Sequence, residues 1–455
     1  MTETFAPLTP ISDLTSGLAS GRTSAVGLLE TAHARAQDPA GEGKRVYLKL
    51  FAETARAEAE ASDRLRAAGV PARPLEGVPI SVKDLFDVAG QVTTAGSRVA
   101  EVDPPATADA PIVARLRAAG AVITGRTNMT EFAYSGIGIN PHFGTPANPW
   151  DRKTGRVPGG SSSGAVISVT DGMAAAGIGS DTGGSVRIPS ALCGIAGFKP
   201  TQSRVPLDGA FALSSSLDSI GPLAPTIACC ALLHQVMSGA PVRSLPVRSV
   251  VGLRFAVPGT LVLDGLDEIV ASGFQAALKR LSEAGAKIVD LPFTELSRIP
   301  EANAKGGFTA VECSALHRRH VERDPDGFDP RVIARIRRAS EQSGSDYYDL
   351  LRARAAIQAS CAAVSSAFDA VLMPTVPRVA PPISDLVASD SAFGEANQAM
   401  LRNPSVGNFL DRCAATVPVH EPGSAPVGLM LMGEHGADDE ILAISAAVEA
   451  LFRIH

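Results

Sequence analysis

The sequence lacks the patterns that mark nucleic-acid-binding and membrane proteins. Its charged residues are intermixed, the formal net charge is −6, and no basic stripe is present that could neutralise phosphates. No window approaches the run of about 18 uncharged apolar residues that crosses a bilayer. We therefore expect no direct nucleic-acid ligand and no membrane insertion, and a neutral or small substrate fits the composition better.

Metal-binding and disulfide patterns are also missing. The six cysteines are Cys193, Cys229, Cys230, Cys313, Cys361 and Cys413; they form no CxxC, and none of the eight histidines lies in an HExxH arrangement. A bond between the adjacent Cys229 and Cys230 would be strained. These absences argue against a zinc site and favour free thiols in a reducing compartment.

The first ten residues, "MTETFAPLTP", contain neither the positive n-region nor the apolar h-region of a signal peptide. Together with the cysteine pattern, this leads us to expect a cytoplasmic protein.

Two segments near the start of the chain have helical apolar spacing. They cover 11–37 and 52–69, and the second ends on Gly69, where a glycine commonly follows a helix. We expect covering helices within an N-terminal region over 1–70.

An alternation of strands and helices follows. Apolar residues at Val78, Ile80 and Val82 predict a strand, and a helix closed by Gly120 precedes a buried strand over 121–125. The same rhythm returns at 251–293, with a helix over 266–285, at 346–375 and at 426–452. This rhythm predicts an α/β fold whose central β-sheet is flanked by α-helices on both faces.

Two stretches interrupt the rhythm. The segment 238–249 contains two prolines among polar residues and is expected to be a surface connection. Whether it separates domains stays open, and a single large domain is favoured for 455 residues with 45% apolar composition. Residues 290–420 are less regular and are expected to supply the substrate pocket.

A first glycine-rich loop reads "GSDTGGSV" at 179–186, where two glycines precede Ser185. Glycine allows backbone conformations that turn several N–H groups toward one point, which is the geometry that an oxyanion requires. A plain glycine turn, with Ser185 as the N-cap of a helix, is the alternative. For this loop in isolation the plain turn is the preferred interpretation.

A second loop reads "GGSSSG" at 159–164 and fits G-x-S-x-G, which would place Ser162 on the nucleophile elbow of an α/β-hydrolase. His420 and His435 lie downstream as its candidate partners. Glycines before a helix also suit a phosphate-binding loop, although the GK[ST] ending is absent. Both interpretations stay open on these residues alone.

Lys83 ends the apolar strand in "GVPISVKDLFD". Period-two alternation groups it with Pro79 and Ser81 on one face of the strand. Most lysines at strand ends are solvated. If Lys83 is buried beside the two serine loops, however, desolvation favours its neutral form and makes it a base.

Taken together, these segments closely resemble the amidase signature family. The resemblance rests on Lys83, on "PGGSSSG" at 158–164 and on "GSDTGGSVRIPSALCGIAGFKPT" at 179–201. It extends over a signature core from about 75 to 225 and more loosely to "PVGLMLMG". Such a long ordered set of motifs is highly specific.

The resemblance implies a Ser-Ser-Lys mechanism. Ser185 is then the acyl-forming nucleophile, Ser161 the bridging serine and Lys83 the terminal base, with a cis peptide between Gly160 and Ser161. The implied oxyanion hole consists of the backbone N–H groups of Thr182, Gly183, Gly184 and Ser185. The residues that match supporting positions are Ser162, Asp181 and Arg187.

Some positions bear on the substrate. Met129 lies where the family's acyl-binding wall runs, with ordinary core packing as the alternative, and Gly160 is a second candidate contact. Ile188 stands where the malonamide-cleaving branch has an arginine, so a malonate-like substrate is not expected. Arg354 falls near the carboxylate-binding arginine of glutaminase subunits, but a surface-helix arginine is favoured.

The resemblance therefore implies an amidohydrolase with a mixed sheet and no cofactor, which cleaves a linear carboxamide through an acyl-serine. Its expected partner is a small-molecule amide, and a homodimer is left open. The alternatives are a glutaminase subunit of a tRNA amidotransferase, which needs a partner, an allophanate- or ureide-type hydrolase, a catalytically idle binding protein, and a serine α/β-hydrolase that uses Ser162.

Overall fold

In residues 6–452, which the computed structural model describes, eleven strands form one mixed sheet. The strands are β1 (Tyr47–Leu50), β2 (Pro79–Lys83), β3 (Val122–Thr127), β4 (Ala176–Ser180), β5 (Ala196–Lys199), β6 (Ile220–Ala224), β7 (Arg254–Pro258), β8 (Lys287–Leu291), β9 (Ala370–Pro374), β10 (Ala414–Pro418) and β11 (Gly428–Met432). Their spatial order is β1-β3-β2-β4-β6-β5-β10-β11-β9-β7-β8. Because this one sheet contains strands from both halves of the chain, the protein is a single α/β domain, as predicted.

The direction of pairing changes across the sheet. Strands β3, β2 and β4 are parallel, the pairs from β4 through β6, β5, β10 and β11 to β9 are antiparallel, and β9, β7 and β8 are parallel again. Strand β1 adds an antiparallel edge to β3.

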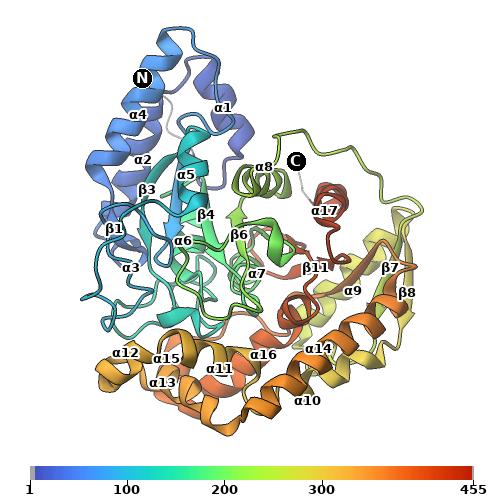
Figure 1. Ribbon diagram of the computed structural model, residues 1–455. Helices are drawn as coiled ribbons and strands as arrows, with labels where there is room; N and C mark the ends of the chain where they lie inside the picture. The colour runs from blue at the N-terminus through green and yellow to red at the C-terminus, as the bar shows by residue number, and fades with distance from the viewer. Residues whose placement is uncertain (1–5, 453–455) are drawn as a thin grey trace.

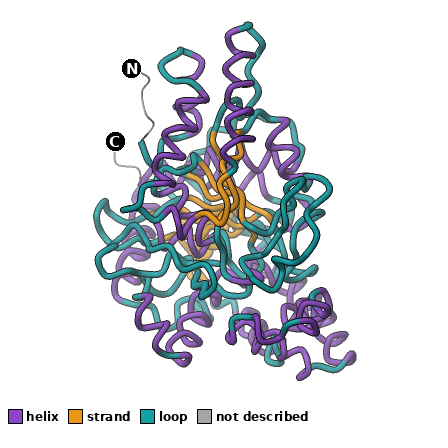
Figure 2. The backbone as a smooth tube through the Cα atoms, turned by 90° about the vertical axis from the view of Figure 1, so that its left-hand side faces the viewer, coloured by secondary structure: helices purple, strands orange, loops and turns teal. Residues whose placement is uncertain are grey.

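Helices surround the sheet, which lies at the centre of the molecule in Figure 2. They are α1 (Ile11–Ala19), α2 (Ala25–Gln37), α3 (Gly43–Val46), α4 (Ala52–Ala67), α5 (Pro111–Ala118), α6 (Ser163–Thr170), α7 (Arg187–Cys193), α8 (Ile227–Ser238), α9 (Glu268–Glu283), α10 (Arg298–Ala302), α11 (Gly307–Leu316), α12 (Arg318–Arg323), α13 (Pro330–Arg337), α14 (Gly344–Ser365), α15 (Ile383–Ala388), α16 (Asp390–Phe409) and α17 (Asp438–Phe452). No helix between residues 6 and 452 combines the length and the apolar character that a bilayer crossing requires.

The alternation along β2 shows how the two faces are covered. Ile80 and Val82 belong to the large apolar cluster that also includes residues of α5, α8 and α17. Ser81, which points the other way, hydrogen-bonds Ser168 of α6 through their hydroxyl groups at 2.8 Å. Lys83 therefore lies on the α6 face, as its spacing from Ser81 predicts.

The N-terminal segment differs from the prediction in one respect. Residues 11–37 form two helices, because the chain turns at Gly21, whose φ is +71°. Ser24 then caps α2, with its hydroxyl accepting the Gly27 N–H. The end of α4 near Gly69 is confirmed, with φ of +77° at that glycine. The expectation drawn from "MTETFAPLTP" rests partly on residues 1–5, which lie outside the described residues.

The later repeats of the rhythm are confirmed, with β7, α9 and β8 in 251–293, α14 and β9 in 346–375, and β11 and α17 in 426–452. Helices α10 to α16 gather at the lower edge of the molecule in Figure 1 and contain most of the less regular stretch 290–420.

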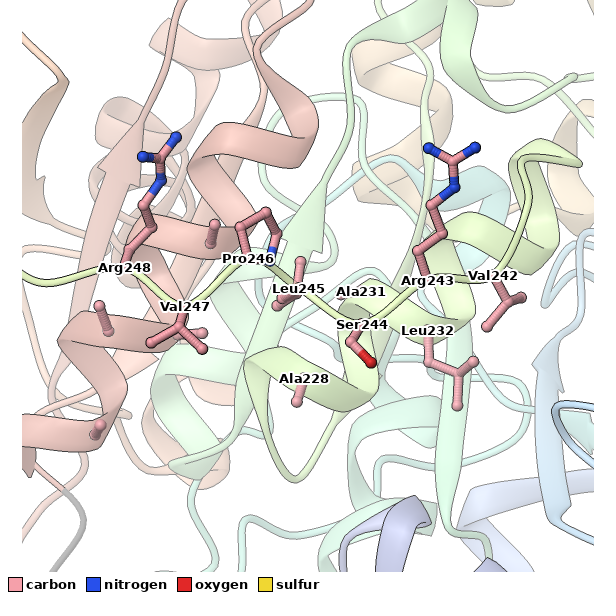
Figure 3. Close-up of a pocket in the computed structure, with 14 residues that line it drawn as sticks. Ala228, Ala231, Leu232, Val242, Arg243, Ser244, Leu245, Pro246, Val247 and Arg248 are labelled. Carbon is pink, nitrogen blue, oxygen red and sulfur yellow. The ribbon is translucent and has the colours of Figure 1, made fainter.

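The predicted surface connection after α8 is also confirmed. Most residues of 239–249 are exposed, and the segment has no regular secondary structure. Figure 3 shows it running over α8, with Ala228 and Ala231 close to Leu245 and the side chains of Arg243 and Arg248 extending to one side. It encloses an apolar hollow of about 570 Å³ that none of the predicted site residues lines.

Gly221 in β6 provides a test of the sheet's packing. A Cβ at this position would lie 2.0 Å from the carbonyl oxygen of Phe198 in the neighbouring β5. Gly221→Ala must push these strands apart, and we expect it to lower the free energy of unfolding by about 1–3 kcal/mol in urea denaturation.

The matched control is Gly344→Ala, because Gly344 begins α14 and has open space where a Cβ would stand. That variant should be neutral or slightly stabilising. Equal stability of Gly221→Ala and the unmodified protein would contradict the packing described.

Candidate active site

Lys83 and Ser161 lie in direct contact in the interior. Both side chains are fully buried, and Lys83 Nζ donates to Ser161 Oγ at 2.6 Å and to Ser180 Oγ at 2.9 Å. Lys83 is the last residue of β2, Ser180 is the last residue of β4, and Ser161 lies two residues before α6. The three groups meet because β2 and β4 are parallel neighbours, so their carboxyl ends reach the same edge.

Burial sets the protonation of this lysine. It lowers the pKa of Lys83 to about 7, although Asp218 and Asp181 oppose the shift through their negative charges. The hydrogen-bond partners of Nζ are hydroxyl groups, so no carboxylate in direct contact holds the ammonium form. A large fraction of neutral amine is therefore present at neutral pH.

The two serine loops are joined through their backbones. The peptide bond between Gly160 and Ser161 is cis, as the family resemblance implies. The Ser162 N–H donates to the Ser185 carbonyl at 3.4 Å, and the Ser161 carbonyl accepts the Thr130 N–H at 3.1 Å. Ser161 and Ser185 are thus placed on adjoining segments.

A buried ion pair holds the loop that carries Ser185. Two nitrogens of Arg187, Nε and Nη2, donate to the Asp181 carboxylate at 3.0 and 2.8 Å, and both side chains are fully buried. Burial alone would raise the pKa of Asp181, but the adjacent Arg187 outweighs it and holds this pKa at about 2. Asn408 of α16 donates to the same carboxylate at 2.9 Å. Asp181 and Arg187 are therefore paired with each other beside Ser185.

The carboxylate of Asp181 changes the expected oxyanion hole. Gly184, whose φ of +127° only glycine adopts readily, donates its N–H to Asp181 Oδ1 at 2.9 Å. The N–H groups of Thr182, Gly183 and Ser185 have no acceptor within residues 6–452. Three of the four expected donors are thus available, and the prediction for Gly184 is wrong because its N–H holds the loop in shape.

Next to this loop lies a cavity of about 1010 Å³. Thr182, Gly183 and Ser185 line one part of it, and the remaining wall is largely formed by residues between 299 and 409. The cavity thus brings the Ser185 loop together with the stretch 290–420.

The two tentative substrate contacts lie elsewhere. Met129 is fully buried in the main apolar cluster and is not among the residues that line the cavity. Gly160 is also buried away from the cavity, and its N–H donates to the Gly136 carbonyl at 2.9 Å. For Met129 the core-packing alternative is correct, because its side chain packs against Gly96 instead.

Ser162 does not form a hydrolase elbow. It stands at the N-cap of α6, and its hydroxyl donates to the Ser180 carbonyl at 3.4 Å. His435 hydrogen-bonds the Asp411 carbonyl at 2.9 Å, and His420 lies against Gly194. Both histidines are therefore engaged away from Ser162.

Arg354 has a structural role in place of the surface position that was favoured. It is partly buried, donates to the carbonyls of Phe409 and Asn408 at 2.8 and 3.2 Å, and lies over the ring of Phe308. These contacts satisfy carbonyls at the end of α16, and Arg354 does not line the cavity.

Sequence reasoning missed three residues of the site, namely Ser180, Asp218 and Asn408. Asp218 accepts the Thr182 hydroxyl at 2.5 Å, and burial raises the pKa of its carboxyl to about 6. Ser180 lies within the predicted loop over 179–186, at the end of β4, so its position was a usable signal. Asn408 lies 227 residues from Asp181 along the chain, and no local pattern marks it.

Comparison with known proteins identifies the class to which this fold and site belong. The family model described as "Amidase" matches residues 29–442. A 2-amino-5-chloromuconic acid deaminase from Comamonas testosteroni is 39% identical, over 87% of this chain and 86% of its own. A glutamyl-tRNA(Gln) amidotransferase subunit from Chloroflexus aggregans is 35% identical, over 96% of this chain and 95% of its own.

A solved crystal structure of an amidase superposes with a TM-score of 0.87 at 31% identity and covers 98% of this chain and all of that chain. The chain therefore belongs to the amidase signature family. It is a hydrolase that acts on the carbon–nitrogen bond of amides.

The Asp181–Arg187 pair gives a prediction on stability. Arg187→Met leaves a fully buried carboxylate without its cation, so we expect the free energy of unfolding to fall by about 3–5 kcal/mol in urea denaturation. The matched control is Arg248→Met, because the ion pair of Arg248 with Glu440 is exposed and should contribute about 0–1 kcal/mol. Similar small losses in both variants would contradict the role assigned to the buried pair.

Proposed function

We propose that the protein hydrolyses a linear carboxamide through an acyl-enzyme on Ser185, with Ser161 and Lys83 as the proton relay. The observation that carries this proposal is the 2.6 Å contact between Lys83 Nζ and Ser161 Oγ in a fully buried setting that holds the pKa of the lysine near 7. Such a lysine is a general base close to neutral pH.

The relay acts in both halves of the reaction. Neutral Lys83 takes the Ser161 proton, and Ser161 takes the proton of Ser185 as that oxygen attacks the amide carbonyl. The N–H groups of Thr182, Gly183 and Ser185 stabilise the oxyanion. The proton then returns through Ser161 to the departing nitrogen, and the same relay activates water to release the acid.

The supporting residues act indirectly. Asp181 and Arg187 keep the loop in the conformation that leaves these N–H groups free. Ser162 links the two serine loops, because its hydroxyl donates to the Ser180 carbonyl. We also propose 290–420 as the substrate-selecting wall, supported by the residues that it contributes to the cavity. The six free cysteines, all of them buried, agree with the proposed cytoplasmic location.

A second candidate is the glutaminase subunit of a tRNA amidotransferase, favoured by the 35% identity to such subunits over nearly the whole chain. Arg354 itself does not serve as the carboxylate contact of such a subunit, because it is engaged with backbone carbonyls and does not line the cavity. Glutamine hydrolysis that appears only with a copurifying partner would favour this candidate. Ammonia release from other small amides or ureides by the purified chain would favour the first proposal.

The nucleophile can be tested by labelling. A fluorophosphonate probe should form its adduct on Ser185, and peptide mass spectrometry locates it. An adduct on Ser162, or none at all, would remove the proposed acyl-enzyme.

The bridging serine can be tested with its neighbour as control. Ser161→Ala should lower kcat by at least about 100-fold, because the proton path is broken. Ser163→Ala should keep normal rates, since the Ser163 hydroxyl is buried and hydrogen-bonds nothing within the described chain. Equal rates in these two variants, measured as ammonia release, would exclude Ser161 from the mechanism.

The pH dependence tests the base. Because Lys83 works in its neutral form, kcat/KM should rise with pH through about 7 and level off above it. Lys83→Met should abolish turnover, and Lys83→Arg should not restore it because guanidinium stays protonated.

Lys199 is the control for this limb of the profile. It is a second buried lysine, and burial lowers its pKa to about 8, but it donates to the carbonyls of Pro200 and Arg412. Folded Lys199→Met should retain the limb near pH 7. If the limb near pH 7 disappeared in Lys199→Met, the titration would belong to Lys199 and not to Lys83.

A further inference from the structure

The cavity beside Ser185 has an excess of positive charge. Four arginines and one glutamate line it, namely Arg335, Arg338, Arg378, Arg402 and Glu395. A cavity built for a neutral amide has no need of this excess, so the surroundings of each arginine decide whether one of them is available to a ligand.

Two of the arginines are neutralised or screened, and a third has only an uncharged hydrogen-bond partner. Arg338 donates to both carboxylate oxygens of Glu341, at 3.1 and 3.0 Å. Arg378 is exposed, so water screens its charge. Arg402 donates from Nε to Asn403 Oδ1 at 3.0 Å, but within the described residues it has no ion pair and its buried Nη2 has no hydrogen-bond partner. Asp264 acts on it at a distance and only partly offsets the lowering of its pKa by burial.

Arg335 also has no carboxylate partner among the described residues, and an aromatic ring fixes its orientation. It comes from α13, is partly buried, and has no carboxylate within ion-pair distance in residues 6–452. Its guanidinium lies over the ring of Tyr134, with Cζ 4.5 Å from the ring centre. Burial lowers the pKa of Arg335, as expected for a cation without a compensating anion.

The ring contact fixes the plane of the guanidinium, and the partner of its N–H groups is the uncharged Tyr134 side chain. A cation held over an aromatic face is stabilised by the ring but keeps its N–H donors in the guanidinium plane. The hydroxyl of Tyr134 donates to Thr309 at 3.2 Å, and both of these residues line the cavity. The arrangement matches the forked geometry that a carboxylate accepts.

We propose that Arg335 binds a carboxylate of the substrate, so that the amides cleaved at Ser185 are small amides that also carry a carboxylate group. The inference rests on the proposed function, because Ser185 and Arg335 line the same cavity and must engage opposite ends of one molecule. The carboxylate pairs with the unmatched cation, and the amide carbonyl lies at the free N–H groups.

Binding separates this inference from catalysis. In Ser185→Ala protein, which cannot form an acyl-enzyme, isothermal titration calorimetry compares succinamate with succinamide and glutaramate with glutaramide. Each pair differs only by a carboxylate in place of a carboxamide. A charge-assisted hydrogen bond to arginine predicts about 10-fold to 100-fold tighter binding of the carboxylate in at least one pair.

The variants assign that preference to a residue. Adding Arg335→Met should remove the preference, and Arg335→Lys should restore part of it because the charge remains without the fork. Adding Arg338→Met is the matched control, because Arg338 lies three residues further along the chain and Glu341 already neutralises it. In that variant the preference for the carboxylate should persist.

Two results would overturn the inference: equal affinity for carboxylate and carboxamide in both pairs, or a preference that survives Arg335→Met. Neither result touches the labelling of Ser185. Conversely, an unlabelled Ser185 together with an Arg335-dependent carboxylate preference would remove the proposed chemistry and keep the binding site.

Discussion

The buried carboxylate of Asp181 is the interaction on which the geometry of the site depends. It accepts N–H groups from Gly184 and Val186 and receives two nitrogens of Arg187. A charge at full burial is tolerable only when paired and fully hydrogen-bonded, so this loop has little freedom to relax. Its rigidity leaves the N–H groups of Thr182, Gly183 and Ser185 without protein acceptors, which is the preorganisation that acyl transfer requires.

Lys83 shows the opposite use of burial. Its neighbours are hydroxyl groups, and the carboxylates of Asp218 and Asp181 act on it only at a distance. Full pairing would keep the lysine protonated, whereas complete isolation would lower its pKa further. The intermediate arrangement holds the amine near its titration point, and the different partners of two buried groups thus separate a structural charge from a proposed base.

The features that the sequence predicts correctly are those set by residues close together in the chain. Alternation along 78–82 fixed the face of Lys83, and the glycine-serine spacing marked both loops, because these are local patterns. The acceptor of the Gly184 N–H was not readable, since the same N–H suits an oxyanion or a carboxylate. Met129 and Arg354 were misplaced for a similar reason: their surroundings come from segments far away in the chain. The cavity wall, assembled from several short helices, has no periodic signature at all.

Asn408 has an evolutionary consequence. Helix α16 contributes several residues to the cavity wall, and its Asn408 also reaches the Asp181 carbonyl and carboxylate, each at 2.9 Å. Most residues of the cavity wall can be substituted during evolution, and new substrates accommodated, without changes in the strands that carry Lys83 and Ser180. Asn408 is the exception, because a substitution there that suits a new ligand also removes hydrogen bonds to Asp181 in the loop that carries Ser185. We therefore expect drift toward new specificities to begin on the helices before α16 and on its N-terminal turns.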